Sequence, residues 1–197
     1  MVLAHAAKRN HKIVRLNDIQ SVFEIEYLKF NCSNLEQKRS NAIHEAGHLA
    51  IYLASGDLGI NPIAVSILSS SDACAVTHCE LPATFCASND LNYYIHLIGA
   101  HLAGKVAEEM YNIPANSCFS DDFADANSLA DKVVNEYGFN FLTTNALTVD
   151  DLITSANKYA EKILLQYRDV IDKIVEKLAV QGILTAPEIQ EIWNSTT

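Results

Sequence analysis

The sequence predicts a mainly α-helical domain with a small β-hairpin or sheet beside one of its helices. Three observations support this fold class. Apolar residues recur at helical spacing over several long segments, one stretch near residues 62–82 has the pattern of extended strands, and Gly or Pro stands at the segment ends. With 197 residues, of which 49% are apolar, the chain is long enough for one domain with its own core.

We expect two regions along the chain. Residues 1–33 form an N-terminal extension with one strand, because apolar and acidic side chains alternate over residues 22–30. Residues 34–197 form the main domain, in which no internal repeat or low-complexity linker is visible.

The first helix of the main domain is predicted from about Ser33 to Ser55. Ser33 and Glu36 make a capping-box pattern at its start, and Gly56 is expected to end it. Strands at 63–68 and 74–81 follow, joined by a polar turn, and together they predict a hairpin.

The rest of the chain reads as helices separated by polar or Gly-containing connections. We expect them at 89–111, capped by Ser88 and ended by Pro114; at 122–137, ended by Gly138; at 150–180, as one long amphipathic helix ended by Gly182; and, finally, after a capping box at 185–188.

Composition and charge narrow the function classes. The net charge of −10, with acidic residues spread along the chain, argues against binding nucleic acid by bulk electrostatics. Five Cys residues form an odd set without zinc-finger spacing, which we interpret as reduced thiols. No apolar run reaches the roughly 18 to 20 residues of a membrane span, and no signal-peptide pattern follows the N-terminal basic residues. We therefore expect a cytoplasmic protein with no membrane span.

The segment His44-Glu45-Ala46-Gly47-His48 fits the pattern H-E-x-x-H inside the first predicted helix. Positions i and i+4 are about 40° apart around a helix and about 6 Å apart along it, so both imidazoles can reach one metal ion. Glu45 lies at the edge of the same face and can take a proton from a metal-bound water. Zinc suits such nitrogen and oxygen ligands.

The same residues could be ordinary polar side chains on a helix surface. Two features argue against this alternative. The flanking residues are apolar, so the polar side chains would lie on a largely buried helix, which is costly unless a metal satisfies them. Gly47 is about 1 kcal/mol worse than Ala in a helix, which indicates that another segment packs closely against it.

A zinc site of this kind needs a third protein ligand, and spacing alone does not identify it. The candidates are Glu80, His96, His101, Glu108, Glu109, Asp121, Asp122 and Asp125. His96 and His101 are about 140° apart on a helix and make a poor pair. His78 lies in a strand between Cys74 and Cys79, where neighbours point to opposite faces, so we interpret this group as structural. The P-loop-like spacing at 99–105 is a coincidence, because Val106 replaces the required Ser or Thr and no strand precedes it.

Several ordered motifs resemble the peptidase domain of the FtsH family, the ATP-dependent zinc metalloproteases of bacterial and organellar membranes. The segment 44–48 matches the family's zinc helix, and 62–82 resembles its hairpin. LAGKVAEE at 102–109 resembles "LGGRAAEE", 117–138 resembles "TGAxNDLxxATxxAxxMVxxYG", and 168–193 resembles the closing helices.

The resemblance implies a zinc-ligand set. In the family the third ligand is the Asp of "NDL", and counting back from Tyr137-Gly138 places it on Asp122, with Asp121 in the Asn position. His44, His48 and Asp122 would then hold Zn²⁺, and Glu45 would be the catalytic base. Glu108 or Glu109 would orient a ligating histidine.

The chain also departs from the family pattern. Cys118 and Phe119 replace a Gly and an Ala before the ligand, and Val76 replaces the Gly of the substrate-facing strand. These changes predict a different loop shape and a different fit to substrate. No segment resembles the ATPase module, so we expect a stand-alone metalloendopeptidase that acts on flexible or unfolded polypeptides.

Two points stay open at this stage. The chain could instead be a catalytically weak interaction or regulatory protein that keeps a zinc site and docks on a partner. Family peptidase domains form rings, so a homo-oligomer is as compatible with the sequence as a monomer.

Overall fold

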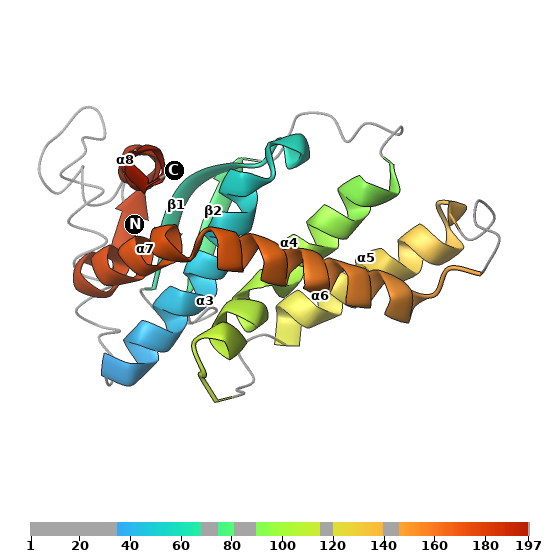
Figure 1. Ribbon diagram of the computed structural model, residues 1–197, viewed down its shortest axis with the longest axis horizontal. Coiled ribbons are helices and arrows are strands. Elements are labelled where there is room, and N and C mark those ends of the chain that lie inside the picture. Colours follow the sequence, from blue (N-terminus) through green and yellow to red (C-terminus); the bar gives the residue numbers. More distant parts are fainter. Residues whose placement is uncertain (1–34, 68–74, 81–89, 115–119, 140–145, 197) are drawn as a thin grey trace, which may run out of the picture.

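The structure, a computed structural model, describes residues 35–67, 75–80, 90–114, 120–139 and 146–196 (Figure 1). These residues form a mainly helical domain with a small three-stranded antiparallel sheet, which confirms the predicted fold class. The predicted strand at 22–30 lies outside the described residues. The division into an extension at 1–33 and a domain at 34–197 therefore stays a prediction.

Helices make up most of the described chain. Their bounds are α3 Leu35–Ala54, α4 Leu91–Met110, α5 Ser120–Asn135, α6 Val149–Gln166, α7 Arg168–Gln181 and α8 Ala186–Thr196, with a short 3₁₀ turn at Gly56–Leu58. None of the helices in the described ranges is both long enough and apolar enough to cross a membrane.

The sheet consists of β1 (Asn61–Ser66), β2 (Val76–Glu80) and β3 (Ile183–Thr185) in the order β2-β1-β3. Strands β1 and β2 form the predicted antiparallel hairpin, with Val65 opposite Thr77. Strand β3 pairs with the other edge of β1 and places Leu184 opposite Val65. The sequence did not predict β3, because a three-residue segment has too few side chains to show a strand period.

Helix α3 lies at the centre of the domain. Its residues Ile43, Ala46 and Leu49 are fully buried. The helix packs against α4, α6 and α7 and against the sheet strands β1 and β2 (Figure 1). An amphipathic surface helix would bury one stripe only, whereas α3 is covered on several sides. The polar side chains of His44, Glu45 and His48 on α3 are therefore held inside the domain.

Close approach of α3 and α4 depends on Gly47. A Cβ atom there would lie 2.5 Å from the Ala103 carbonyl oxygen and 2.7 Å from the Ala107 Cβ. Only a residue without a side chain lets the two backbones pack at this distance. The expectation that a neighbouring segment packs tightly against Gly47 is confirmed.

The prediction of one long helix over 150–180 was wrong. The segment forms α6 and α7, which are separated at Tyr167, a residue with φ −107° and ψ 27°. The Tyr167 ring packs on Trp193 of α8 with ring centroids 4.8 Å apart. Helix α6 packs mainly on α4, whereas α7 packs mainly on α3, so the two helices have different main neighbours. No Gly or Pro marks the break, which is why the sequence does not show it.

The helix ends are mostly as expected. Gly182 ends α7 in the left-handed conformation, at φ 76°. Glu188 accepts hydrogen bonds from the backbone N–H and the hydroxyl of Thr185, at 2.9 and 2.7 Å, as in a capping box. The cap of α4 is Asp90 rather than Ser88, because its carboxylate accepts a hydrogen bond from the Tyr93 N–H. Ser88 itself lies outside the described residues.

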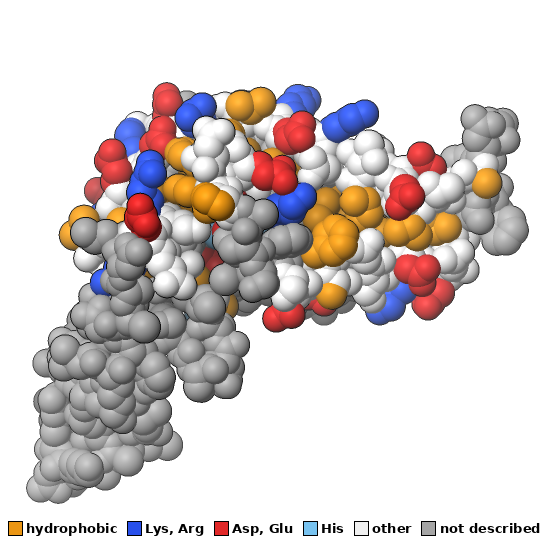
Figure 2. Space-filling model, turned by 90° about the horizontal axis from the view of Figure 1, so that it is seen from below, with side chains coloured by type: hydrophobic (Ala, Val, Ile, Leu, Met, Phe, Trp, Pro, Cys, Tyr) orange, Lys and Arg blue, Asp and Glu red, His pale blue; other side chains and the backbone are white. Residues whose placement is uncertain are grey.

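Acidic and basic side chains of the described residues are interspersed with hydrophobic ones on the face shown in Figure 2. This face therefore has no extended basic patch among its described residues, in keeping with the acidic net charge.

Candidate metal centre

His44 and His48 point their imidazoles to one spot on the face of α3. Both side chains are buried, with 7% and 6% of their surface exposed. Their Nε2 atoms lie 3.1 Å apart, which the i, i+4 spacing on a helix allows. The predicted pairing of the two imidazoles is therefore present in the folded chain.

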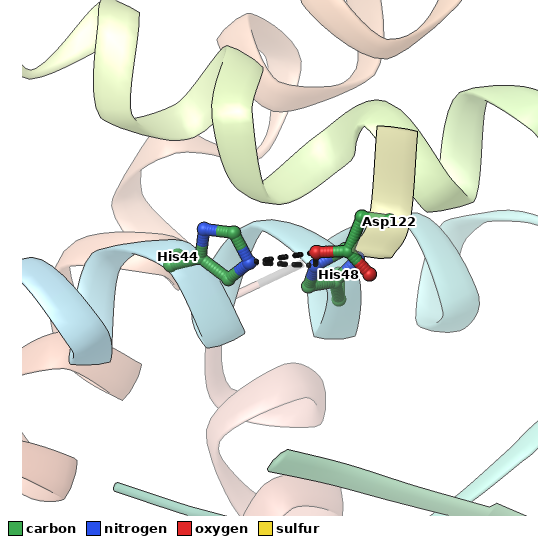
Figure 3. Close-up of side chains that lie close together, drawn as sticks. All are labelled: His44, His48 and Asp122. Carbon is green, nitrogen blue, oxygen red and sulfur yellow. Dashed lines mark hydrogen bonds and ion pairs between the residues drawn. The ribbon is translucent and has the colours of Figure 1, made fainter. Parts of the chain in front are cut away.

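Asp122 completes this group from another helix. It lies in the first turn of α5, where the helix dipole favours a carboxylate. Its Oδ2 atom is 3.1 Å from His44 Nε2 and 3.4 Å from His48 Nε2 (Figure 3). One ligand atom from each of the three residues falls within 4.8 Å of the others, which is a geometry that could hold a metal ion.

The second nitrogen of each imidazole is held by the protein. His48 Nδ1 lies 2.7 Å from the carbonyl oxygen of Ala100 on α4. His44 Nδ1 lies 3.3 Å from Glu108 Oε1 on the same helix. In the neutral form of each ring, a proton on Nδ1 satisfies these acceptors and leaves the Nε2 lone pair facing Asp122.

Of the two glutamates that the sequence left open, only Glu108 contacts a histidine of the group. Its side chain is buried, with 4% exposed. Glu109 is exposed and pairs with Lys105 at 3.0 Å, one helical turn away. Adjacent residues on a helix differ by about 100° in direction, so one of them faces α3 and the other faces solvent.

Glu45 is buried beside the histidines, with 5% of its surface exposed. Its Oε2 accepts a 2.6 Å hydrogen bond from the hydroxyl of Thr77 on β2. Sequence reasoning missed Thr77, because a threonine in a predicted strand is common and only the packing of the sheet on α3 brings it to Glu45.

Gly104 makes room for the imidazoles. A Cβ atom at this position of α4 would lie 2.4 Å from His44 Nε2 and 2.6 Å from His48 Nε2. Those are the two nitrogen atoms that face Asp122. The small residue is therefore a requirement of the group itself and not only of helix packing.

The charges of the group are strongly coupled in the metal-free protein. Burial alone would lower the pKa of His44, but hydrogen bonds to Asp122 and Glu108 outweigh it and raise the pKa to about 9. Burial likewise acts to raise the pKa of Asp122, yet hydrogen bonds to His44 and His48 hold it well below its usual range. A buried imidazolium and carboxylate satisfy each other when no cation is present.

The other candidate ligands are not members of the three-residue group. His96 stacks on the Tyr159 ring with centroids 4.0 Å apart. Asp121 and Asp125 are exposed on α5. Burial lowers the pKa of His101, which is half-buried on α4 and is not a member of the three-residue group. The side chain of Glu80 and the whole of Cys74 lie outside the described residues.

The donor set fits a zinc ion. It offers two imidazole nitrogens and one carboxylate oxygen, which are common zinc ligands, and three protein ligands leave a fourth position for water or substrate. The Gly104 backbone leaves space at the Nε2 atoms, where a side chain would block access. Fold and site together define a helical domain with a His-His-Asp group that could hold a metal ion.

The known proteins that this chain resembles in sequence include zinc metalloproteases. No family model matches the chain. In an alignment 215 positions long, the chain is 25% identical to the ATP-dependent zinc metalloprotease FtsH 2 of Phytoplasma mali, and the alignment covers 96% of this chain and 31% of that protein. It is 26% identical to FtsH 2 of Thermoanaerobacter sp. over 183 residues, with 84% and 35% covered. It is also 25% identical to FtsH of Acholeplasma laidlawii over 223 residues, with 95% and 34% covered.

These similarities are weak but extend over most of the chain. The chain spans about a third of the length of the curated relatives that it matches. The relatives are zinc metalloproteases by name, and similarity to them suggests a protease role.

Proposed function

We propose that this chain is a zinc metallopeptidase that corresponds to the peptidase region of FtsH proteins. In this proposal His44, His48 and Asp122 hold Zn²⁺, and Glu45 is the catalytic base. The observation that carries it is the convergence of the two Nε2 atoms and the Asp122 carboxylate, with Glu45 buried one residue away from the first histidine. The weak similarity to zinc metalloproteases supports the same reaction class.

A bound zinc ion would supply a Lewis acid that polarises the scissile carbonyl and lowers the pKa of a water molecule. The chain's own residues supply the rest of the chemistry. Glu45 takes a proton from the attacking water and passes it to the leaving amine. Glu108 and the Ala100 carbonyl hold the imidazoles in one orientation, so the ligands need no rearrangement during turnover.

Strand β2 is the proposed binding surface for the polypeptide. It is at the edge of the sheet in the described part of the chain, and Thr77 on this strand contacts Glu45. An extended segment could add to this edge by main-chain hydrogen bonds, which place its backbone next to the catalytic base. Strand addition requires an unfolded segment, so we propose that the 197-residue chain cleaves flexible or unfolded polypeptides without ATP.

Cleavage of a generic unfolded substrate tests this proposal. Zinc-loaded protein is incubated without ATP with unfolded casein and with a quenched peptide library, alongside a chelator-treated sample and Glu45→Gln. We expect hydrolysis that disappears in both controls. Hydrolysis that persists in Glu45→Gln refutes the assigned role of Glu45. Stoichiometric zinc without turnover of any peptide would instead favour the interaction or regulatory protein that the sequence left open.

A further inference from the structure

Tyr52 lies on the same face of α3 as the metal-binding group. It follows His48 by four residues and Glu45 by seven, which places it about 40° and 20° from them around the helix axis. Side chains on a helix lean toward its N-terminus and cover the preceding turn. This geometry directs the Tyr52 side chain back toward the turn that carries His48 and Glu45.

The electrostatic surroundings of the phenol agree with this direction. Burial comes first, followed by the ionisable groups of Cys79, Asp122 and Glu45, and together they raise the pKa of Tyr52 well above its ordinary value. These groups come from β2, α5 and α3, so charges from three elements around the metal-binding group act on the phenol. A phenol with a raised pKa keeps its proton at any pH near neutrality and can act only as a neutral hydrogen-bond partner.

The ring and the hydroxyl of Tyr52 have different roles. The half-buried ring packs against the core, which a phenylalanine could also do. The hydroxyl makes no hydrogen bond to another described residue, and buried or half-buried tyrosine hydroxyls usually find a partner. A substrate atom entering the site could be that partner.

We propose that the hydroxyl of Tyr52 donates a hydrogen bond to the oxygen of the scissile carbonyl as that oxygen becomes negatively charged. This inference rests on the proposed peptidase function. When water adds to the carbonyl carbon, the water proton goes to Glu45 and the π electrons of the C=O bond move onto the oxygen. Tyr52 keeps its proton throughout and stabilises the charge. It is thus a catalytic residue that acts without changing its protonation state.

A donor of this kind acts in the transition state more than in the ground state, because charge on the oxygen develops only then. Removing one such donor typically lowers kcat by about 100-fold or more. The variant Tyr52→Phe keeps the ring and removes only the hydroxyl. We expect kcat to fall by about 100-fold, with KM changed less than about threefold.

A binding measurement separates this role from a change in the metal site. Zinc content is measured first, and Tyr52→Phe is expected to bind zinc as wild type does. The affinity for a phosphinic peptide, whose tetrahedral anionic group imitates the charged oxygen, is then measured by calorimetry. We expect Tyr52→Phe to weaken binding of this peptide at least tenfold. Binding of the uncleaved substrate peptide is compared in two inactive variants, Glu45→Gln and Glu45→Gln/Tyr52→Phe, and we expect the two affinities to be equal.

Tyr167→Phe is the matched control, because Tyr167 lies between α6 and α7, where its ring packs on Trp193 of α8. It should behave as wild type in each assay. Unchanged kcat and unchanged phosphinic-peptide affinity in Tyr52→Phe overturn the inference, as does an effect confined to KM. If wild type shows no metal-dependent cleavage, the proposed function fails. If wild type and Tyr52→Phe are equally active, the proposed function stands and only the role of Tyr52 is refuted.

Discussion

Thr77 on strand β2 donates a 2.6 Å hydrogen bond to Glu45 on helix α3. This bond ties the edge of the sheet to the carboxylate proposed to be the catalytic base. Because Glu45 is buried, its carboxylate has few other ways to be satisfied or held in place. The orientation of the base is therefore coupled to the strand that is proposed to bind substrate.

We expect Thr77→Val, which keeps the shape of the side chain but removes the donor, to lower kcat by roughly 10- to 100-fold, because a misplaced catalytic group loses rate steeply. The free energy of unfolding should also fall by about 1–3 kcal/mol, since a buried carboxylate loses a partner. Steady-state kinetics and urea unfolding measure the two effects. Thr77→Ser retains the hydroxyl and should recover most of the rate; equal losses in both variants would contradict a role for the hydrogen bond.

The close approach of Gly104 to the imidazoles leads to a second prediction, on zinc affinity. In Gly104→Ala the new Cβ would fall 2.4 Å from His44 Nε2, so the imidazoles must turn away from the position that faces Asp122. We expect the variant to fold but to bind zinc at least tenfold more weakly than wild type, which metal analysis after equilibrium dialysis measures. Gly56→Ala is the control, because a Cβ there meets nothing within 4 Å. Wild-type zinc affinity in Gly104→Ala would show that the imidazoles do not bind metal through Nε2.

The adjacent glutamates of α4 give a matched pair of variants. Glu108 contacts His44 Nδ1, whereas Glu109 pairs with Lys105 at the surface. Loss of a group that orients a ligating histidine typically costs 10- to 100-fold in metal affinity. Glu108→Gln keeps an acceptor but removes its charge, so we expect a loss of about tenfold, at the lower end. Competition with a chromophoric chelator measures it, and Glu109→Gln should match wild type; the opposite order would mean that the other glutamate orients the site.

Local patterns in the sequence were enough to single out the residues of the candidate site that lie on one element. His44, Glu45 and His48 share one helix, so their spacing fixes their relative positions before any tertiary contact is known. Asp122 could be singled out only by resemblance, because it reaches the histidines from a helix that is 78 residues further along the chain than His44. The choice between Glu108 and Glu109 needed the packing of α4 on α3.

Features that depend on non-local contacts were not predictable. Strand β3 exists because β1 offers it an edge, and Ile67 donates a 2.9 Å hydrogen bond to Gly182 just before it. The break at Tyr167 separates two helices whose main neighbours differ, α4 for α6 and α3 for α7, and no Gly or Pro marks it in the sequence. Thr77 is an ordinary strand residue until the sheet packs on α3, so its contact with Glu45 has no signature in the sequence.

The raised pKa of His44 predicts how metal-free protein responds to pH. A group whose pKa is higher in the folded than in the unfolded state stabilises the fold fully below the unfolded pKa of 6.5, and this contribution is lost as pH rises through about 9. Zinc requires the neutral imidazole, so binding must release the His44 proton. The free energy of unfolding of metal-free protein should therefore fall between pH 6.5 and 9.5, while the affinity for zinc rises over the same range.

Urea unfolding of chelator-treated protein at several pH values measures the first trend, and His44→Gln supplies the reference because it lacks the titrating group. The fall in stability should be smaller in His44→Gln than in wild type, since only wild type carries an imidazolium held by Asp122 and Glu108. Calorimetry of zinc binding at pH 7.5 in two buffers of different ionisation enthalpy counts the released protons, of which His44 should contribute close to one because its pKa of about 9 lies above that pH. If the free energy of unfolding falls equally with pH in the two proteins and zinc binding releases no proton, His44 is already neutral in the metal-free site. Its hydrogen bonds to the two carboxylates would then not stabilise an imidazolium.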